Sequence, residues 1–223
     1  RILRQALKYK PIDWTAHGYL AEAFLCQGRP AAARSELKRA QAAAPRKDRG
    51  QVLAWRGELE LWRGNYDEAF RLSQAACGLG AIFAFCWRGA AKLKQGKPRE
   101  ALKYLDQAVK RYPIDLEAYV WRGQAKWELG FLRGALEDFN RAPDWIWSRC
   151  GRALVRYALK DYKGMKEDFN FLPGSMAAYL KKKAGVPPGK ALNAEEMKEV
   201  LESGFKLSRG FRRNGYGQMA WMA

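Results

Sequence analysis

Small residues recur along this chain at fixed places within a pattern of helical period. The tripeptide Trp-Arg-Gly occurs three times, ending at Gly57, Gly89 and Gly123, at steps of 32 and 34 residues. In each copy a second glycine follows seven residues later, an alanine five residues after that, and another alanine seven beyond. Glycine at a helix end permits a left-handed turn, and small side chains let two helices approach closely. The pattern therefore predicts a series of helix pairs, each joined by a tight turn.

The same spacing divides most of the chain into five units. Ala21 takes the place of the first glycine in the first unit, and Met165 replaces an alanine in the last. Pro113 is expected to end the second helix of the third unit, and Pro143, which comes earlier, to shorten that of the fourth. The predicted units are residues 14–49, 50–81, 82–115, 116–145 and 146–173.

Both ends of the chain depart from this pattern. Residues 1–13 resemble the second helix of a unit whose first helix is absent, so we expect the array to extend toward the N terminus and to expose there an apolar face that favours self-association. Residues 174–223 are predicted to form capping helices followed by an irregular basic tail. Within them Ser175–Ala184 predicts a short helix, and Asn193 with Glu196 three residues later is a capping signature for another.

The order of small, aromatic, alanine and proline positions in a unit of about 34 residues resembles the tetratricopeptide repeat family. The resemblance implies an all-α fold, a right-handed α-solenoid of antiparallel helix pairs with a C-terminal helical cap. Arg56, Arg88 and Arg122 depart from the commonest form of the repeat, which has leucine at that place. We interpret these arginines as structural, with heads that reach a carboxylate or helix-end carbonyls, and a ligand role is the alternative.

In this family the concave wall, lined by the first helix of every unit, is the usual binding groove for peptides. Large aromatic side chains supply most of the hot-spot energy at interfaces, roughly 2 kcal/mol or more each. The tryptophans could instead pack helix on helix; both roles stay open for Trp62 and Trp127, and for Trp55, Trp87 and Trp121, which repeat in register, we expect the groove. Carrying the groove positions over one at a time gives Tyr19, Glu22, Trp55, Glu58, Trp62, Trp87, Lys94, Trp121, Gln124, Trp127, Trp147 and Tyr157.

The charge of the chain widens the choice of partner. Its 41 Lys and Arg face 23 acidic residues, a net charge of +18 that attracts acidic proteins, nucleic acid or anionic lipid. Glutamates at groove positions, among them Glu22, Glu58, Glu117 and Glu128, would repel phosphate. The sequence thus predicts a protein-interaction scaffold or adaptor whose partner is a protein or peptide, acidic if the net charge is the guide. Nucleic-acid binding through basic and stacking aromatic residues is the alternative.

Catalytic chemistry finds little support. His17 is the single histidine, the four cysteines form no C-x-x-C pair, and no glycine-rich phosphate loop is present. We expect neither an enzyme nor a cofactor or metal; a regulatory repeat region of an enzyme whose catalytic domain lies elsewhere is a third reading. No run approaches the roughly 18 apolar residues that span a bilayer. Free cysteines suit a reducing compartment such as the cytoplasm.

Overall fold

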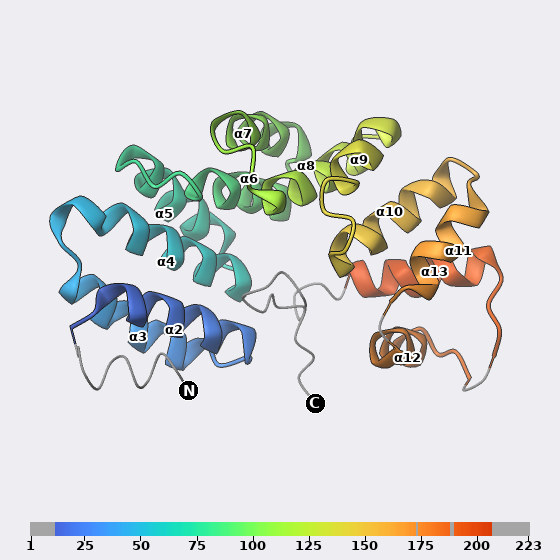
Figure 1. Cartoon of the computed structure of the whole chain (residues 1–223), viewed down its shortest axis with the longest axis horizontal. Helices are drawn as coiled ribbons and strands as arrows, with labels where there is room; N and C mark the ends of the chain where they lie inside the picture. Colours follow the sequence, from blue (N-terminus) through green and yellow to red (C-terminus); the bar gives the residue numbers. More distant parts are fainter. Residues whose placement is uncertain (1–11, 173, 188–189, 207–223) are drawn as a thin grey trace. The chain divides into compact units, whose positions relative to one another are not determined.

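The computed structural model describes residues 12–172, 174–187 and 190–206 (Figure 1). The helix predicted within residues 1–13, the self-association expected of it, and the tail beyond Lys206 lie outside these residues. The described chain is helical and contains no β-strand, which confirms the prediction of an all-α fold. Its helices are α2 (Trp14–Cys26), α3 (Pro30–Ala43), the 3-10 turn η1 (Arg46–Asp48), α4 (Arg49–Arg63), α5 (Tyr66–Gly78), α6 (Ala84–Lys94), α7 (Pro98–Arg111), α8 (Leu116–Glu128), α9 (Leu132–Phe139), α10 (Ile146–Ala158), α11 (Tyr162–Asn170), α12 (Gly174–Lys183) and α13 (Ala194–Lys206).

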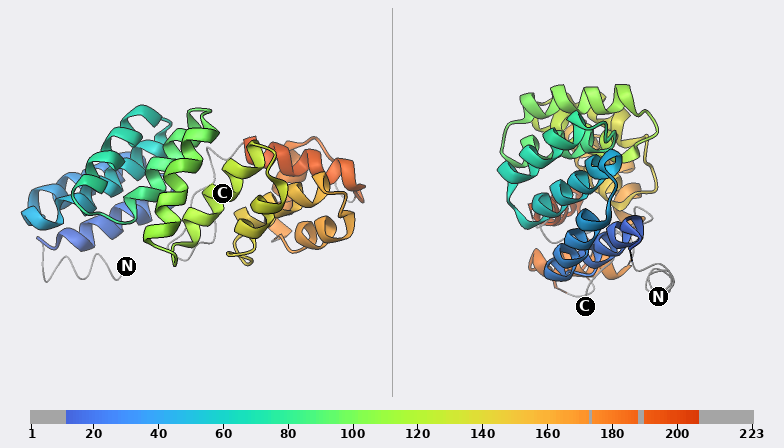
Figure 2. Two further views of the ribbon diagram at one scale, coloured as in Figure 1. Left: turned by 90° about the horizontal axis from the view of Figure 1, so that it is seen from above. Right: turned by 90° about the vertical axis from the view of Figure 1, so that its left-hand side faces the viewer.

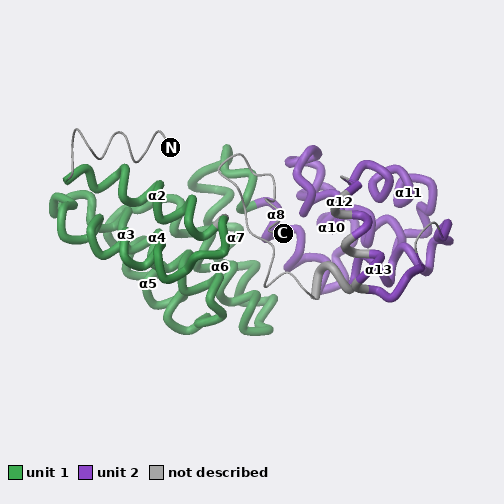
Figure 3. Tube along the Cα trace, turned by 90° about the horizontal axis from the view of Figure 1, so that it is seen from below, with its two compact units in different colours: residues 1–118, 212–223 green, residues 119–211 purple. Residues whose placement is uncertain are grey.

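Consecutive helices pack as hairpins and the hairpins stack. In α2–α3, α4–α5, α6–α7 and α10–α11 the two helices contact each other, and α4 and α6 each pack against the hairpin that precedes them (Figure 2). The chain divides into two compact units (Figure 3): unit 1 contains α2 to α7, and unit 2 contains most of α8 together with α9 to α13. Within each unit the fold is the stacked-hairpin solenoid that the repeat pattern predicts.

The recurring small residues bring the helices of a hairpin together. A Cβ atom added at Gly89 would lie 2.5 Å from Cγ of Leu105 on the facing helix, and one at Gly57 would lie 2.5 Å from Oγ of Ser73. Real Cβ atoms do not approach so closely, so a side chain at either position would force Leu105 or Ser73 to move. The close contact fixes which face of each first helix meets its own second helix.

The turn between the two helices uses a left-handed residue in every hairpin. In the first four, glycine takes this conformation, with φ between +73° and +84°. In the fifth, Lys160 stands at the corresponding position with φ +63°, although a left-handed backbone costs about 1–2 kcal/mol in a residue with a Cβ. The geometry of the hairpin therefore imposes a left-handed backbone that a lysine residue otherwise avoids.

The two boundary signals act as predicted. The helix before Pro143, α9, has 8 residues, whereas α7 has 14. At the start of α13 the Asn193 backbone N–H donates to the Glu196 carboxylate at 2.9 Å, and the Glu196 N–H donates to Oδ1 of Asn193 at 3.0 Å. This reciprocal capping box satisfies two donors that a helix start leaves unpaired.

Candidate functional site

The candidate residues lie on the first helices α2, α4, α6, α8 and α10, and the structure separates them by exposure. Five are buried and seven keep part of their surface exposed. Some of these side chains belong to unit 1 and the others to unit 2. The buried set is Trp55, Glu58, Trp87, Trp121 and Gln124; the partly exposed set is Tyr19, Glu22, Trp62 and Lys94 in unit 1 with Trp127, Trp147 and Tyr157 in unit 2.

The three tryptophans that repeat in register are inside the protein. Trp55, Trp87 and Trp121 are only 4–6% exposed, which leaves a partner little ring surface to contact. Trp55 packs into a core with Phe24 and Leu37 of the first hairpin. The expectation that these three rings line the groove therefore gives way to the packing role, because their side of the first helix faces neighbouring helices.

Two buried polar side chains stand beside these rings. Glu58 accepts a hydrogen bond from Nε1 of Trp62 at 3.4 Å. Gln124 donates from Nε2 to the Glu128 carboxylate at 3.1 Å, but no donor in the described part of the chain reaches its buried carbonyl oxygen. Leaving such an acceptor unmet costs about 1–3 kcal/mol. Gln124 is as buried as the three tryptophan rings, so a partner has little access to it.

Tyr19 is the most exposed of the aromatic candidates, at 55%. Its ring stands edge-on to Trp55, with the centroids 5.5 Å apart and the planes at 70°. Trp55 is in turn held by Trp14, at 6.1 Å, and Trp62 packs against the same core cluster. Tyr19 contacts Trp55 of the core cluster, and Trp62 packs against that same cluster of unit 1.

The repeat arginines make contacts within and between hairpins. Arg122 donates to both carboxylate oxygens of Asp138, at 2.9 and 2.6 Å, across its own hairpin. Arg88 donates to Gln107 at 2.6 Å and to Gln74 of the preceding hairpin at 3.0 Å. These contacts support the structural interpretation of the arginines.

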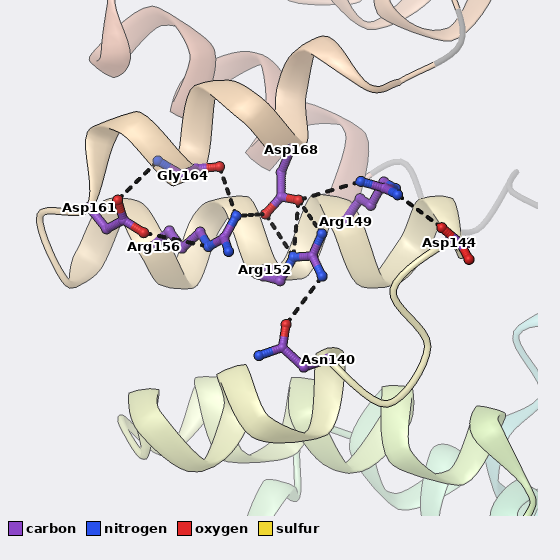
Figure 4. Close-up of polar contacts among 8 residues, drawn as sticks. All are labelled: Asn140, Asp144, Arg149, Arg152, Arg156, Asp161, Gly164 and Asp168. Carbon is purple, nitrogen blue, oxygen red and sulfur yellow. Dashed lines mark hydrogen bonds and ion pairs between the residues drawn. The ribbon is translucent and has the colours of Figure 1, made fainter.

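A larger cluster, missed from the sequence, lies in unit 2 (Figure 4). Arg149, Arg152 and Arg156 follow one face of α10 and converge on Asp168 of α11, which is 2% exposed. Arg152 also donates to Oδ1 of Asn140 at 3.1 Å, from the end of α9. The cluster ties three consecutive helices together. One signal was available: Asp168 follows Arg152 by sixteen residues, the same separation as between Arg122 and Asp138.

The last candidate, Tyr157, is covered in part by α13. Its hydroxyl donates to the Glu195 carboxylate, and Nζ of Lys198 lies 5.2 Å from the centre of its ring. Tyr162 packs against its other side, with the ring centres 5.7 Å apart. The hydrogen bond raises the pKa of Tyr157, and that bond together with the one from Lys198 lowers the pKa of Glu195.

These shifts give the contact a defined pH window. Glu195 has a lowered pKa, so its contribution is complete above the ordinary value of 4.5 and is lost as the pH falls below it. Tyr157 has a raised pKa, so its contribution is complete below 10 and is lost at higher pH. We expect Tyr157→Phe to lower the melting temperature by about 2 °C or less between pH 5 and 9. Melting curves should converge with wild type outside that range; a constant difference at all pH values would contradict this.

Other reactive chemistry is scarce in the described residues. Cys77, Cys86 and Cys150 are free thiols, and burial raises the pKa of the Cys150 thiol to about 12. Within the described chain, no group of three or more His, Cys, Asp or Glu residues is placed to hold a metal ion. None of its helices has the length and apolar character needed to span a bilayer.

Comparison with known proteins agrees with this geometry. Residues 1–48 and 88–145 match the tetratricopeptide repeat family. No curated protein matches the chain.

Several solved structures are similar in fold. A thermophilic tetratricopeptide repeat protein of Thermus thermophilus is 15% identical, with a TM-score of 0.63 over 86% of this chain and 99% of that one. PilF of Pseudomonas aeruginosa is 19% identical, with a TM-score of 0.58 over 90% and 86%. The Cut9–Hcn1 structure of the APC/C is 16% identical, with a TM-score of 0.69 over 94% of this chain but 42% of that one. Residues 1–48 and 88–145 thus match the tetratricopeptide repeat family in sequence, and the stacked hairpins have the fold of solved tetratricopeptide repeat proteins.

Proposed function

We propose that this protein is a non-catalytic scaffold that binds a segment of a partner protein on the exposed faces of its first helices. Tetratricopeptide repeat proteins act in general as interaction scaffolds, and the chain matches that family over residues 1–48 and 88–145. The proposal goes further than the fold, because it assigns the contact to particular side chains.

The observation that carries the proposal is the exposed ring of Tyr19. A ring that is 55% exposed and already fixed edge-on against buried Trp55 loses little freedom when a partner covers it. Trp62 packs on the same cluster and is oriented by its hydrogen bond to Glu58. Rigid aromatic side chains of this kind are typical hot spots of protein interfaces.

In unit 2 the corresponding contacts would come from Trp127 and Trp147, which keep part of their surface exposed. These aromatic side chains would provide affinity for the bound segment.

The test begins with peptides selected from a random library on the intact protein, whose affinity is measured by fluorescence anisotropy. Some of the selected peptides will bind to unit 1. We expect Tyr19→Ala and Trp62→Ala each to weaken the binding of these peptides by about thirtyfold, the equivalent of about 2 kcal/mol. Circular dichroism should show unchanged helicity, because Tyr19 is largely outside the core.

Ile114→Ala is the matched control. Ile114 is also an apolar residue of unit 1, 72% exposed, but it lies in the connection between α7 and α8. This variant should bind the peptides as the wild type does. Unchanged affinity in folded Tyr19→Ala and Trp62→Ala proteins, or equal losses in all three variants, would refute the proposed surface.

A further inference from the structure

Helix α13 packs on the last hairpin of unit 2 as an amphipathic helix on a protein surface does (Figure 1). Met197, Val200 and Leu201, at positions i, i+3 and i+4, are all buried, while Glu195 and Glu199 are exposed. Apolar anchors at this spacing are the pattern by which a helical ligand occupies a groove. The chain thus carries, near its end, a helix with the properties of a ligand.

The position of α13 differs from that of the next first helix in a stack. In unit 1, α4 and α6 pack mainly against the second helix of the preceding hairpin, α3 and α5. Helix α13 instead packs more against the first helix, α10, than against the second, α11, and it contacts α12 to the same extent as α10. It is on this first helix that Tyr157, a residue predicted to line the groove, donates its hydroxyl hydrogen to Glu195.

Two ion pairs near the start of α13 are local and do not join it to the α10–α11 hairpin. Glu195 pairs with Lys198 at 2.9 Å within the helix, and Glu196 pairs with Lys190 at 2.5 Å just before it, both at exposed positions. Exposed pairs of this kind contribute little to stability. Between α12 and α13 the described residues 184–187 and 190–193 are not helical, and Gly185 is left-handed. In these described residues no helix would have to unwind for α13 to leave the α10–α11 hairpin.

We infer that the α10–α11 face beneath α13 is a docking surface for an amphipathic helix of a partner protein, and that α13 is a built-in competitor that occupies it. The partner helix would carry apolar side chains at i, i+3 and i+4, with an acidic residue two positions before the first to meet Tyr157. This inference rests on the proposed function, since it assumes that the first helices bind protein. It adds that the ligand is an amphipathic helix and that α13 of the same chain competes with it.

The experiment uses the full chain and a labelled synthetic peptide of residues 190–206. The undocked variant, Val200→Asp with Leu201→Asp, removes two anchors and should open the surface. We expect it to bind the peptide at least tenfold more tightly than wild type does, because the competing helix is no longer seated. Glu199→Gln, on the exposed side of α13, should bind the peptide no better than wild type, and a peptide with both aspartates should not bind.

Hydrogen exchange distinguishes the release of α13 from the unfolding of unit 2. In wild type, α13 amides should exchange faster than α10 amides, and Tyr157→Phe should speed exchange in α13 alone. Joint exchange of α10 and α13, or a folded undocked variant that fails to bind the peptide, would overturn the inference and make α13 an integral part of the fold. Tyr19→Ala, in unit 1, should leave binding of this peptide unchanged, so the result is separate from the test of the proposed function.

Discussion

Replacing Asp168 with asparagine is expected to lower the free energy of unfolding of unit 2 by about 3–5 kcal/mol. The Asp168 carboxylate is buried and accepts hydrogen bonds from Nε of Arg152, at 3.0 and 2.8 Å, and from Arg156 at 2.8 Å. Arg149 lies 3.7 Å away on the same side (Figure 4). Asparagine keeps the shape but removes the charge, which leaves three guanidinium groups close together with no buried carboxylate between them.

The matched control is Asp144→Asn. Asp144 pairs with Arg149 at 3.1 Å, but its side chain is 86% exposed. Water and salt screen such a pair, so its removal should change the stability by no more than about 1 kcal/mol. Urea unfolding followed by tryptophan fluorescence compares the two variants. Similar midpoints for both would mean that the cluster contributes no more than an ordinary surface pair.

The features that the sequence predicted are those that depend on neighbouring residues. The close approach at Gly89, the short helix before Pro143 and the capping box of Asn193 and Glu196 each follow from local geometry. Repetition made them easier to recognise, because the same spacing appears in several hairpins. The stacking of hairpins followed from the same pattern, since each pair of helices needs a neighbour to cover its apolar side.

The exposure of the candidate residues could not be predicted in the same way. A first helix meets its own second helix and the adjacent hairpins, and helical period alone does not say which of these surfaces a given residue faces. Trp55 and Trp62 are seven residues apart on α4, close to two turns, yet the structure buries the first and leaves the second partly exposed. The repeated spacing of Trp55, Trp87 and Trp121 therefore predicted that they share a role, but it did not say whether that role is packing or binding.

The sequence also did not predict the contacts between segments that are far apart in the chain. Arg152 and Asp168 repeat the spacing of Arg122 and Asp138, but Leu72 and Tyr104 stand at that place in the second and third hairpins, so the pairing is not part of the repeat. The docking of α13 on Tyr157 joins residues 38 apart, across a connection of no regular structure. Neither follows from local periodicity.

Trp55 provides the sharpest test of the packing role, and we expect Trp55→Ala to lower the free energy of unfolding of unit 1 by about 3–5 kcal/mol. The ring lies between the first and second hairpins, against Phe24, Leu37 and Leu59. A Cβ atom added at Gly18 would fall 2.0 Å from its Cζ3 atom, so α2 and the ring are in close contact. Truncation to alanine would leave a cavity that rigid helices fill only in part.

Trp62→Ala gives the comparison within the same helix. Trp62 keeps part of its surface exposed, so its removal should cost clearly less than that of Trp55, while it weakens peptide binding. Urea midpoints and peptide affinities of the two variants should then fall in opposite order, with Trp55 dominating stability and Trp62 dominating binding. If Trp55→Ala instead keeps its stability within about 1 kcal/mol of wild type and loses the peptide, the ring belongs to the binding surface and the first interpretation of the register was correct.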